Sequence, residues 1–498
     1  MVRAEDVVKS LGARLTPSPT DASELPAIGE ALHRVGYTWE GVAGLLEVPD
    51  LTTSMGFMNL PGYVWRCLRE DSPRAHMAML FLLGEAVARH RVEAVLGASG
   101  VDALLRRDLL VVDSDPDQVR SRVDLYPFEG AFVFADRVFG PARQREHVYE
   151  PGNDSVGLAR ATPRRLARRA LDLCSGSGIQ AILCARAGIT CVGVDLYARP
   201  VAFATVNATM NGVSDRCTFA RGNLYEAVRG LTFDLIVANP PWVPTLETDM
   251  HRHRTGGVDG EDATRAIVAG LPTALEEGGT LAMAVNYPVI RGSRYVDRIA
   301  SWLGGVRGWG IAVLDFGVVP LEEYIRWHMT PAGDLHRHRQ QFAEWMAAYE
   351  LLGIEAMAIG NVYLRRLPPT WPSWTAHKRG PRPQASVVGL IEDWLDGLAR
   401  FHAPGWSVDW EEWKPCLNPL LDGLWLDARG QRGRAEDGWS DPVALDADEA
   451  WLTARATGHK TAARLAEGFA AHHGLQDEIA RRRVAELLAA LGARQVLR

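Results

Sequence analysis

The chain has 498 residues, with 54 basic and 61 acidic side chains and a formal net charge of −7. Its composition is 47% hydrophobic and 23% charged, which is typical of a globular protein and excludes wholesale disorder or a fibrous repeat. At roughly 150 residues per domain, this length predicts about three domains, each large enough to bury its own core.

The same arithmetic argues against several classes of protein. A pI of about 6.1 gives no overall attraction to nucleic acid, so binding of RNA would require a local basic patch. No apolar run approaches the roughly 20 residues that span a bilayer, and the start MVRAEDVVKS does not resemble a signal peptide. The six cysteines include no CxxC pair, so we expect neither a disulfide framework nor a structural zinc site. We therefore expect a cytoplasmic protein without a metal and without a membrane partner.

Residues 1–140 are expected to form a helical, winged-helix-like N-terminal domain. Residues 24–48 show helical periodicity interrupted at Gly36, and residues 75–106 continue in helical style. The runs LLVVDSD and VRSRVDLYPFEGAFVFAD then alternate like strands, with DSDPD as the turn between them. Because its arginines are scattered, this module is more typical of a docking or lid domain than of a nucleic-acid reader.

Residues 141–370 are expected to form an α/β domain. The runs RALDLC, TCVGVD, CTFARGN, FDLIVANPPW and GGTLAMAVNYP predict five strands that alternate with helices. Residues 311–319 and 356–367 predict a sixth and a seventh strand with a helical insertion between them. The pattern therefore predicts a Rossmann-like, seven-stranded, doubly wound sheet. Beyond it, residues 375–498 are expected to form a mostly helical C-terminal domain.

The turn after the first of these strands is the first candidate site. It contains Asp172, Cys174, Ser175, Gly176 and Gly178, and glycines between a strand and a helix let the backbone approach a ligand closely. Asp195 ends the next strand 17 positions after Gly178, where a carboxylate can accept hydrogen bonds from both hydroxyls of a ribose. The turn lacks the Gly-Lys-Ser/Thr ending of a P-loop, and it departs from the dinucleotide fingerprint at Ala181. These features favour a nucleoside-containing cofactor other than NAD.

The second candidate site is Asn239-Pro240-Pro241-Trp242, at the end of the fourth strand. Two prolines cannot continue a central strand, so they fix a rigid turn at the carboxyl edge of the sheet, where open α/β sheets bind ligands. The side-chain oxygen of Asn239 and the main-chain carbonyl of Pro240 are suited to accept both hydrogens of a planar NH2 group. Trp242 is suited to stack on a flat substrate.

These segments resemble the class I S-adenosylmethionine-dependent methyltransferases of the N-methylating Asn-Pro-Pro-aromatic group. The runs ALDLCSGSGIQA, GVDLYARPVAFATVNATMNG, GNLYEA, FDLIVANPPWVP and GGVDGEDATRAIVAGLPTALEEGG carry the resemblance. The region from about residue 148 to 290 is similar to release-factor glutamine methyltransferases and to adenine-N6 or guanine-N2 methyltransferases. The flanks resemble winged-helix-like additions of large methyltransferases. The resemblance implies that residues 141–370 are the methyltransferase domain.

The resemblance also implies S-adenosylmethionine as the cofactor and assigns contacts to particular residues. Cofactor contacts are implied for the Asp172–Gly178 loop, for Asp195 with Leu196 at the ribose, and for Asn223 with Leu224 at the adenine. The substrate is implied to meet residues 239–242, of which Asn239 also borders the cofactor. Residues 150–155 are implied to fold over the cofactor.

The chain departs from this family in three respects. Asn223 stands where the family usually has an acidic residue, and Trp242 replaces the commoner Tyr or Phe. The long front end and the extra tail replace a compact helical bundle, which leaves the acceptor open. It is a small amine or amide metabolite, a protein side chain such as glutamine, or the amine of a base in a structured RNA, which the acidic charge disfavours. Two further alternatives are an O- or C-methyltransferase of a specialised metabolite and a non-catalytic regulator that senses the cofactor.

Two His-Arg-His-Arg motifs, at residues 251–254 and 336–339, are weaker candidates. Either motif is able to contact an acidic substrate or to transfer a proton. We expect both to be solvated loops, and no carboxylate stands at a spacing that supports a metal site.

Overall fold

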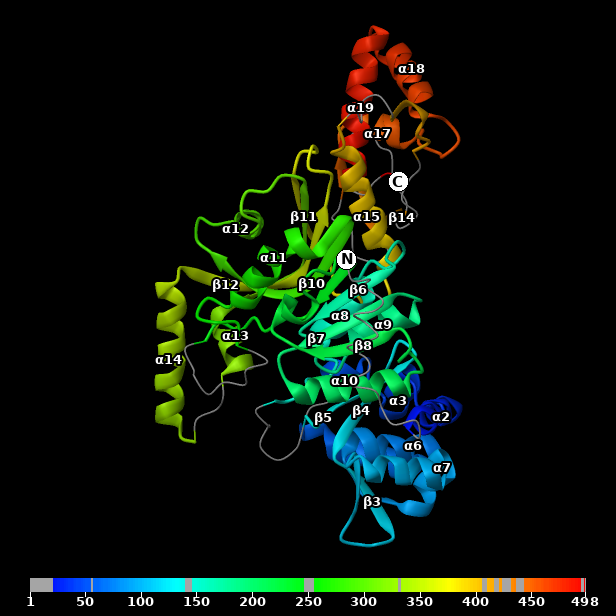
Figure 1. Ribbon diagram of the computed structural model, residues 1–498. Helices are drawn as coiled ribbons and strands as arrows, with labels where there is room; N and C mark the ends of the chain where they lie inside the picture. Colours follow the sequence, from blue (N-terminus) through cyan, green and yellow to red (C-terminus); the bar gives the residue numbers. More distant parts are fainter. Residues whose placement is uncertain are drawn as a thin grey trace. The chain divides into compact units, whose positions relative to one another are not determined.

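The computed structural model describes residues 21–54, 57–138, 146–245, 255–329, 333–404, 410–415, 421–422, 431–435, 443–493 and 497 (Figure 1). The chain divides into two compact units, residues 1–159 with 166–275 and residues 160–165 with 276–498. The expected scheme of three domains, 1–140, 141–370 and 375–498, stays a prediction. Within the described ranges, no helix is both long enough and apolar enough to cross a membrane.

The first unit begins with helices that surround a buried apolar core. The predicted break at Gly36 is confirmed, because this residue has φ +71° and lies between the first two helices. The side chain of Thr38 accepts the N–H of Gly41 and caps the second helix. The elements are α2 (Asp21–Arg34), α3 (Trp39–Leu46), α4 (Leu51–Ser54), η1 (Phe57–Asn59), α5 (Leu60–Glu70), α6 (Pro73–Ala78), η2 (Met79–Leu83) and α7 (Arg89–Arg106).

A small antiparallel sheet of order β1-β3-β2 follows, made of β1 (Val87–Ala88), β2 (Leu110–Val112) and β3 (Gln118–Ser121). The β2–β3 hairpin confirms the predicted strands on either side of DSDPD. Gly97, with φ +73° and ψ 157°, interrupts α7 and divides it into two helical segments. The second predicted strand run is longer than one strand, because it supplies β3 and a separate hairpin. The description of this region as winged-helix-like stays a prediction.

The separate hairpin is capped along one edge by two asparagine amides. β4 (Val123–Phe128) pairs with β5 (Ala131–Asp136), and in the described part of the chain this sheet has two strands. Asn211 donates to the carbonyl of Phe132 at 2.7 Å and accepts its N–H at 2.9 Å. Asn207 forms the same pair with Phe134, at 3.0 Å and 2.8 Å. The two amides therefore satisfy the edge of β5 as a strand would.

The geometry of a helix explains why this arrangement fits. Both asparagines are on α10 (Ala198–Met210) or directly after it, four residues apart, which is about 6 Å along a helix axis. Two residues of a strand span about 6.7 Å, so the two amides reach Phe132 and Phe134 together. Asn207 is fully buried and also donates to the carbonyl of Ser177 at 2.9 Å. It thereby joins the hairpin to the turn that contains the first candidate site.

We predict that Asn207→Ala destabilises the protein far more than Asn211→Ala. The first change leaves three buried backbone groups, two of Phe134 and one of Ser177, without their partners. Each such group costs about 1–3 kcal/mol, so we expect a loss of at least about 3 kcal/mol in the free energy of unfolding. Asn211 is partly exposed and water replaces its bonds, so a loss of about 1 kcal/mol is expected there. Urea denaturation followed by circular dichroism measures both losses, and equal losses would contradict the special role of Asn207.

Four parallel strands form the remaining sheet of the first unit, in the order β8-β7-β6-β9. They are β6 (Arg169–Leu173), β7 (Thr190–Asp195), β8 (Cys217–Arg221) and β9 (Phe233–Ala238), and the helices beside them are α8 (Asn153–Ala161), α9 (Ile179–Arg186), α10, η3 (Leu224–Val228) and α11 (Asp262–Ala274). The chain runs outward from β6 to β8 and then returns to β9 on the other side of β6. The strand order therefore reverses at β6, and open α/β sheets bind their ligands at such a point.

In the second unit, four described strands pair in the order β10-β12-β11-β13. These are β10 (Leu275–Ile290), whose first residue lies in the first unit, β11 (Trp309–Pro320), β12 (Ile354–Arg366) and β13 (Trp374–Arg379). The predicted sixth and seventh strands are confirmed as β11 and β12. Between them lie α13 (Leu321–His328) and α14 (Leu335–Leu351), which confirm the helical insertion, and α12 (Tyr295–Trp302) precedes β11. The predicted α/β class is confirmed, and β13, which the sequence did not indicate, pairs in parallel with β11.

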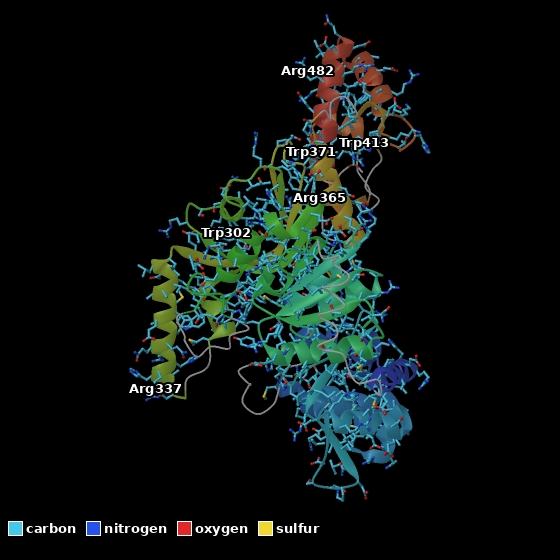
Figure 2. All side chains as sticks on the ribbon, in the orientation of Figure 1. Trp302, Arg337, Arg365, Trp371, Trp413 and Arg482 are labelled. Carbon is cyan, nitrogen blue, oxygen red and sulfur yellow. The ribbon has the colours of Figure 1, made fainter. Side chains whose placement is uncertain are left out.

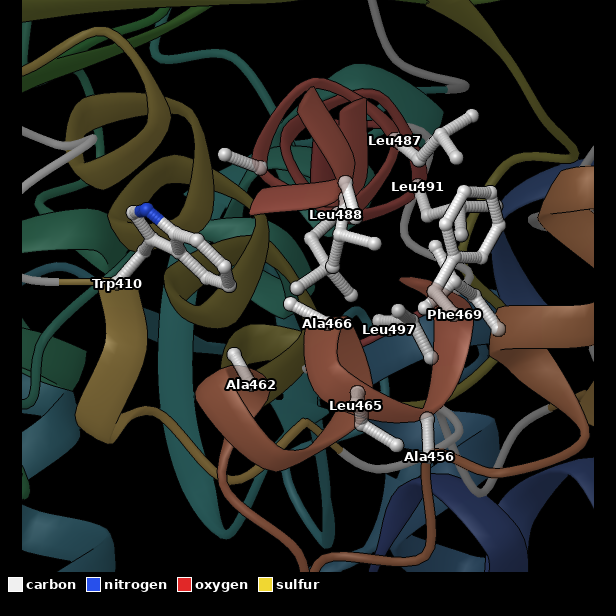
Figure 3. Close-up of a cluster of buried hydrophobic side chains, with 14 of the residues drawn as sticks. Trp410, Ala456, Ala462, Leu465, Ala466, Phe469, Leu487, Leu488, Leu491 and Leu497 are labelled. Carbon is white, nitrogen blue, oxygen red and sulfur yellow. The ribbon is translucent and has the colours of Figure 1, made fainter. Parts of the chain in front are cut away.

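The remainder of the second unit is mostly helical, as predicted. α17 (Ala447–Thr453), α18 (Ala462–His473) and α19 (Asp477–Ala493) enclose an apolar core with Trp410 and Phe469 (Figure 3). α15 (Val388–Phe401) is tied to β12 by an ion pair between Asp396 and Arg365. Short pieces complete it: η4 (Trp410–Glu412) and the strands β14 (Leu421–Asp422), β15 (Gln431–Ala435) and β16 (Val443–Leu445).

Candidate functional site

The turn after β6 has an unusual backbone, as its composition predicts. Cys174, Gly176 and Gly178 have φ of +57°, +53° and +80°, and α9 begins directly afterwards. A Cβ atom on Gly178 would lie 2.8 Å from both the Cβ of Ala204 and the Cζ of Phe219. Gly178 is therefore required both for its backbone angle and for close packing against α10 and β8.

Gly176 differs from Gly178 in its surroundings. A Cβ atom added to Gly176 would meet Cys174 O at 4.0 Å as its nearest described neighbour. This face of the turn is therefore open, and a ligand has room to approach the backbone there.

We predict that Gly178→Ala destabilises the fold more than Gly212→Ala. Both glycines have positive φ, +80° and +66°, so both variants carry the cost of a side chain in that conformation. Among the described residues, nothing lies within 4 Å of a Cβ on Gly212, so only Gly178→Ala also creates overlaps. We expect an additional loss of about 1–3 kcal/mol for Gly178→Ala in thermal or urea unfolding. If the two variants lose the same stability, the packing role of Gly178 is wrong.

Asp195 at the end of β7 holds the open turn in place. Its carboxylate accepts the N–H of Gly176 at 2.9 Å and the N–H of Tyr197 at 3.1 Å. Burial raises the pKa of Asp195 above the ordinary aspartate value, while these backbone hydrogen bonds act in the opposite direction. Asp195 therefore lies directly beside the glycine turn.

Asp172 is placed beneath the turn. Its carboxyl is buried and accepts the N–H of Ala181 at 3.1 Å in the first turn of α9. Burial raises the pKa of Asp172 well above its usual value. Asp172 therefore shapes the turn from within the fold, and a direct contact with the cofactor stays a prediction. Ser175 is also buried, and Cys174 is half-buried with a thiol whose pKa is raised by burial.

The residues implied at the adenine lie at the adjoining strand end. The N–H of Gly222 donates to the main-chain carbonyl of Asp195 at 2.9 Å, which places the end of β8 beside the end of β7. Asn223 and Leu196 are exposed, and Leu224 adopts a positive φ of +49°. Their side chains are thus accessible at the same edge of the sheet, and their contacts with a cofactor stay predictions.

Asn239 follows β9 and lies beside the glycine turn. β6 and β9 are in register with Leu173 opposite Ala238, so the residues that follow both strands leave the sheet next to each other. The Nδ2 atom of Asn239 donates to Oδ2 of Asp154 at 2.8 Å and to Oγ of Ser155 at 3.0 Å. Its Oδ1 atom is buried, with no hydrogen-bond partner among the described residues. The two candidate sites therefore lie side by side at one edge of the sheet.

The partners of Asn239 are functional candidates that sequence reasoning did not pair with it. Asp154 and Ser155 are in the first turn of α8, which the sequence indicated only as part of a segment near the cofactor. The main-chain carbonyl of Ser155 accepts from Gln180 at 2.8 Å, and Gln180 is buried in the first turn of α9. The two helices that begin at this edge are therefore held together.

The Pro-Pro-Trp segment after Asn239 is also braced. Pro240 is buried, and Val243 forms an isolated bridge with Thr255. A Cβ atom on Gly260 would lie 2.6 Å from the main-chain oxygen of Trp242, so residues 255–260 pass closely over the segment. Trp242 is half-buried. The sequence indicated the rigid turn but not the covering residues.

The two His-Arg-His-Arg motifs have different outcomes in the structure. Residues 251–254 lie outside the described residues. Residues 336–339 belong to α14, on which Arg337 is labelled in Figure 2. Asp334 caps the N-terminus of this helix and accepts the N–H of Arg337 at 2.9 Å. The expectation of a loop at residues 336–339 was therefore wrong. The described residues contain no group of three or more His, Cys, Asp or Glu side chains placed to hold a metal.

Comparison with known proteins identifies the central region. Residues 153–297 match the methyltransferase small domain, and residues 34–122 match a domain of unknown function (DUF7059). A protein of Methanocaldococcus jannaschii named "Putative protein N5-glutamine methyltransferase" is 34% identical over 140 residues, which are 27% of this chain and 70% of that protein. The chain belongs to this methyltransferase family.

Two further relatives of the methyltransferase are similar over shorter parts of their length. The ribosomal protein uL3 glutamine methyltransferase of Bordetella pertussis is 36% identical over 130 residues, 24% of this chain and 44% of that protein. The release factor glutamine methyltransferase of Rhodospirillum rubrum is 38% identical over 127 residues, 23% of this chain and 39% of that protein. The chain thus spans less than half of the length of these two relatives. The resemblance to the N-methylating group is confirmed.

The cofactor of this family, S-adenosylmethionine, fits the described residues of the methyltransferase. The open face of Gly176 leaves room beside the backbone, as a bound nucleoside cofactor requires. The carboxylate of Asp195 stands at the end of the second parallel strand, where a ribose is commonly bound. The orphaned Oδ1 of Asn239 lies at the neighbouring strand end.

Proposed function

We propose that the protein transfers a methyl group from S-adenosylmethionine to the nitrogen of a primary amide, the side chain of a glutamine in a protein. The observation that carries this proposal is the amide of Asn239. Its nitrogen is occupied by Asp154 and Ser155, whereas its buried oxygen Oδ1 lacks a partner among the described residues. A buried acceptor without a donor costs free energy, and an incoming N–H group would satisfy it.

The same geometry favours an NH2 group over other acceptors. Oδ1 of Asn239 accepts hydrogen bonds and does not donate them, so it pairs with the N–H of an amide or amine and not with a carbonyl oxygen. The main-chain carbonyl oxygen of Pro240 is the second acceptor. The peptide nitrogen bonded to this carbonyl belongs to Pro241 and carries no hydrogen. Two acceptors aimed at one nitrogen orient its lone pair and favour the positive charge that develops there during attack.

The cofactor supplies the reactive methyl group, activated by the sulfonium sulfur to which it is bonded. We assign the ribose of the cofactor to Asp195 and its adenine to the exposed Asn223 and the half-buried Leu224. The cofactor approaches the backbone at the open turn around Gly176. The rigid turn at Pro240 and Pro241 fixes the acceptor relative to that turn. With the NH2 group held in place, positioning supplies much of the barrier reduction.

Protein is favoured over nucleic acid as the acceptor by the relatives and by the charges of the front region. The relatives in Bordetella pertussis and Rhodospirillum rubrum are named for glutamine methylation of a ribosomal protein and of a release factor. In the front region, Arg106 pairs with Glu24 at 2.6 Å and Arg89 pairs with Asp102 at 2.8 Å. These cations are already neutralised, whereas binding to a polyanion draws on unneutralised lysines and arginines. We assign the winged-helix-like front region to docking of the acceptor protein.

We predict that Asn239→Ala abolishes most methyl transfer and leaves cofactor binding intact. The wild-type protein should transfer tritium from labelled S-adenosylmethionine into the protein fraction of a cell extract, and acid hydrolysis should recover it in methylamine released from N5-methylglutamine. Loss of a transition-state hydrogen-bond partner of this kind reduces kcat by about 10²–10³-fold. Affinity for S-adenosylhomocysteine, measured by calorimetry, should stay within about threefold, because the Asn239 change removes no ribose contact. Asn211→Ala is the matched asparagine control.

The distribution of label decides among the alternatives. Label in RNA or in small molecules would reject the protein acceptor, and label on oxygen or carbon would reject the amide. Binding of S-adenosylhomocysteine without transfer into any fraction would favour a sensor of the cofactor. Full activity of Asn239→Ala would reject the assigned role of its amide.

We predict that cofactor affinity depends on the ionisation of Asp195. The carboxylate accepts hydrogen bonds from the ribose hydroxyls, so affinity for S-adenosylhomocysteine is highest above its pKa and falls as pH decreases through it. Because burial raises the pKa of Asp195, the decline should occur at higher pH than an ordinary aspartate would give. Calorimetry across a pH series should show this decline in the wild type and its absence in Asp195→Asn. Asp215→Asn, at a highly exposed carboxylate, should keep the wild-type profile. An unchanged profile in Asp195→Asn would contradict the assignment.

A further inference from the structure

We propose that Asp154 and Ser155 are positioning residues that lock the amide of Asn239 with its oxygen toward the acceptor nitrogen. This inference rests on the proposed function, because it concerns the same NH2 group. It assigns a role toward Asn239 to two side chains that the proposed function leaves without one. It also explains why the amide of Asn239 presents its oxygen, and not its nitrogen, to the substrate.

A half-turn about the Cβ–Cγ bond of an asparagine exchanges the positions of its oxygen and nitrogen and leaves the shape of the side chain nearly unchanged. In one orientation Asn239 offers an acceptor to the substrate, and in the other it offers N–H donors that oppose the donors of the incoming NH2 group. The wrong orientation therefore blocks productive binding. A site that depends on this amide needs a neighbouring group that makes the two orientations unequal in free energy.

Asp154 is such a group. Its carboxylate only accepts hydrogen bonds, so it favours the orientation in which Nδ2 of Asn239 faces it. Its Oδ2 lies 2.8 Å from Nδ2 of Asn239, and an amide oxygen in the same position would face a like partial charge. Oγ of Ser155 lies 3.0 Å from the same Nδ2 atom. Both hydrogens of Nδ2 are then engaged, so Asn239 has no N–H left to donate to the substrate. Only its oxygen is available to the substrate.

The pair also strengthens that oxygen as an acceptor. A hydrogen bond from an amide N–H to a carboxylate polarises the amide and increases the negative charge on its oxygen. The group that remains for the substrate is thus better suited to bind an N–H group that is gaining positive charge.

The surroundings of Asp154 and Ser155 are consistent with a fixed support. Oδ1 of Asp154 accepts from the hydroxyl of Tyr149 at 3.2 Å, and the N–H of Val156 donates to the carbonyl of Gly152 at 2.9 Å. The main chain of Ser155 is held by Gln180 at 2.8 Å, directly after the glycine turn. Asp154 and Ser155 are therefore anchored next to the turn assigned to the cofactor. The position of the substrate nitrogen is thereby fixed relative to the methyl group.

The test combines a double-mutant cycle with a measurement on the amide itself. Asp154→Asn keeps the shape of the side chain but introduces donors, so it should favour the wrong orientation of Asn239. We expect kcat to fall about 10–100-fold, with affinity for S-adenosylhomocysteine within about threefold of wild type. In the Asn239→Ala background, the same change should alter kcat by less than about twofold, because Asp154 acts through Asn239. Ser155→Ala should show a smaller loss, and Ser155→Thr should restore most of it.

An independent readout is the side-chain NH2 group of Asn239, observed by NMR after selective ¹⁵N labelling of asparagine. Its signals are assigned by their loss in Asn239→Ala. In the wild type they should exchange slowly with water, and in Asp154→Asn and Ser155→Ala they should shift and exchange about tenfold faster or more.

Each outcome bears on the proposal separately from the proposed function. Equal losses from Asp154→Asn in the wild-type and Asn239→Ala backgrounds would overturn it, as would unchanged signals of the Asn239 amide in Asp154→Asn. If the wild-type protein methylates no protein glutamine, the proposed function fails, and the NMR measurement still decides whether Asp154 and Ser155 fix the amide. Circular dichroism confirms that each variant is folded before either measurement.

Discussion

The parallel pairing of β6 with β7 on one side and with β9 on the other determines where the chemical groups of this methyltransferase lie. Leu173 is in register with Val194 and with Ala238, so the residues that follow these three strands leave the sheet at one level. The glycine turn, Asp195 and Asn239 are those residues. The proposed reaction thus depends on three strand ends, and each group is held by a backbone that the sheet already fixes.

Local patterns were enough to predict this edge of the sheet, because the apolar runs and the Gly or Pro residues that end them are adjacent in sequence. Asn239 and its partners are different. Asp154 is 85 residues before it, and the choice of that carboxylate as the partner of Nδ2 depends on how α8 packs, which no periodicity records. The only available signal was the polar Asp-Ser pair at the start of a helix, which also suits an ordinary helix N-terminus.

The errors have similar physical causes. Residues 374–379 were not among the predicted strands, yet they form β13, which pairs in parallel with β11. Residues 336–339 were expected to form a solvated loop, yet they lie in a helix that Asp334 caps. In both cases the start of a new element was not recognised from the local pattern.

The hairpin of the front region contributes to the support of the glycine turn. The amide of Asn207 is used completely: Oδ1 accepts from Phe134, while Nδ2 donates to Phe134 and to Ser177, which lies between Gly176 and Gly178. A shift of β5 along α10 therefore either breaks these buried bonds, at about 1–3 kcal/mol for each unsatisfied group, or moves Ser177 with it. Because the first outcome is costly, the second is favoured, and the position of the hairpin becomes linked to the shape of the turn. This linkage gives a physical reason why the front residues and the four parallel strands form one compact unit. An acceptor protein that docks on the front region would thereby act on the same backbone that we assign to the cofactor.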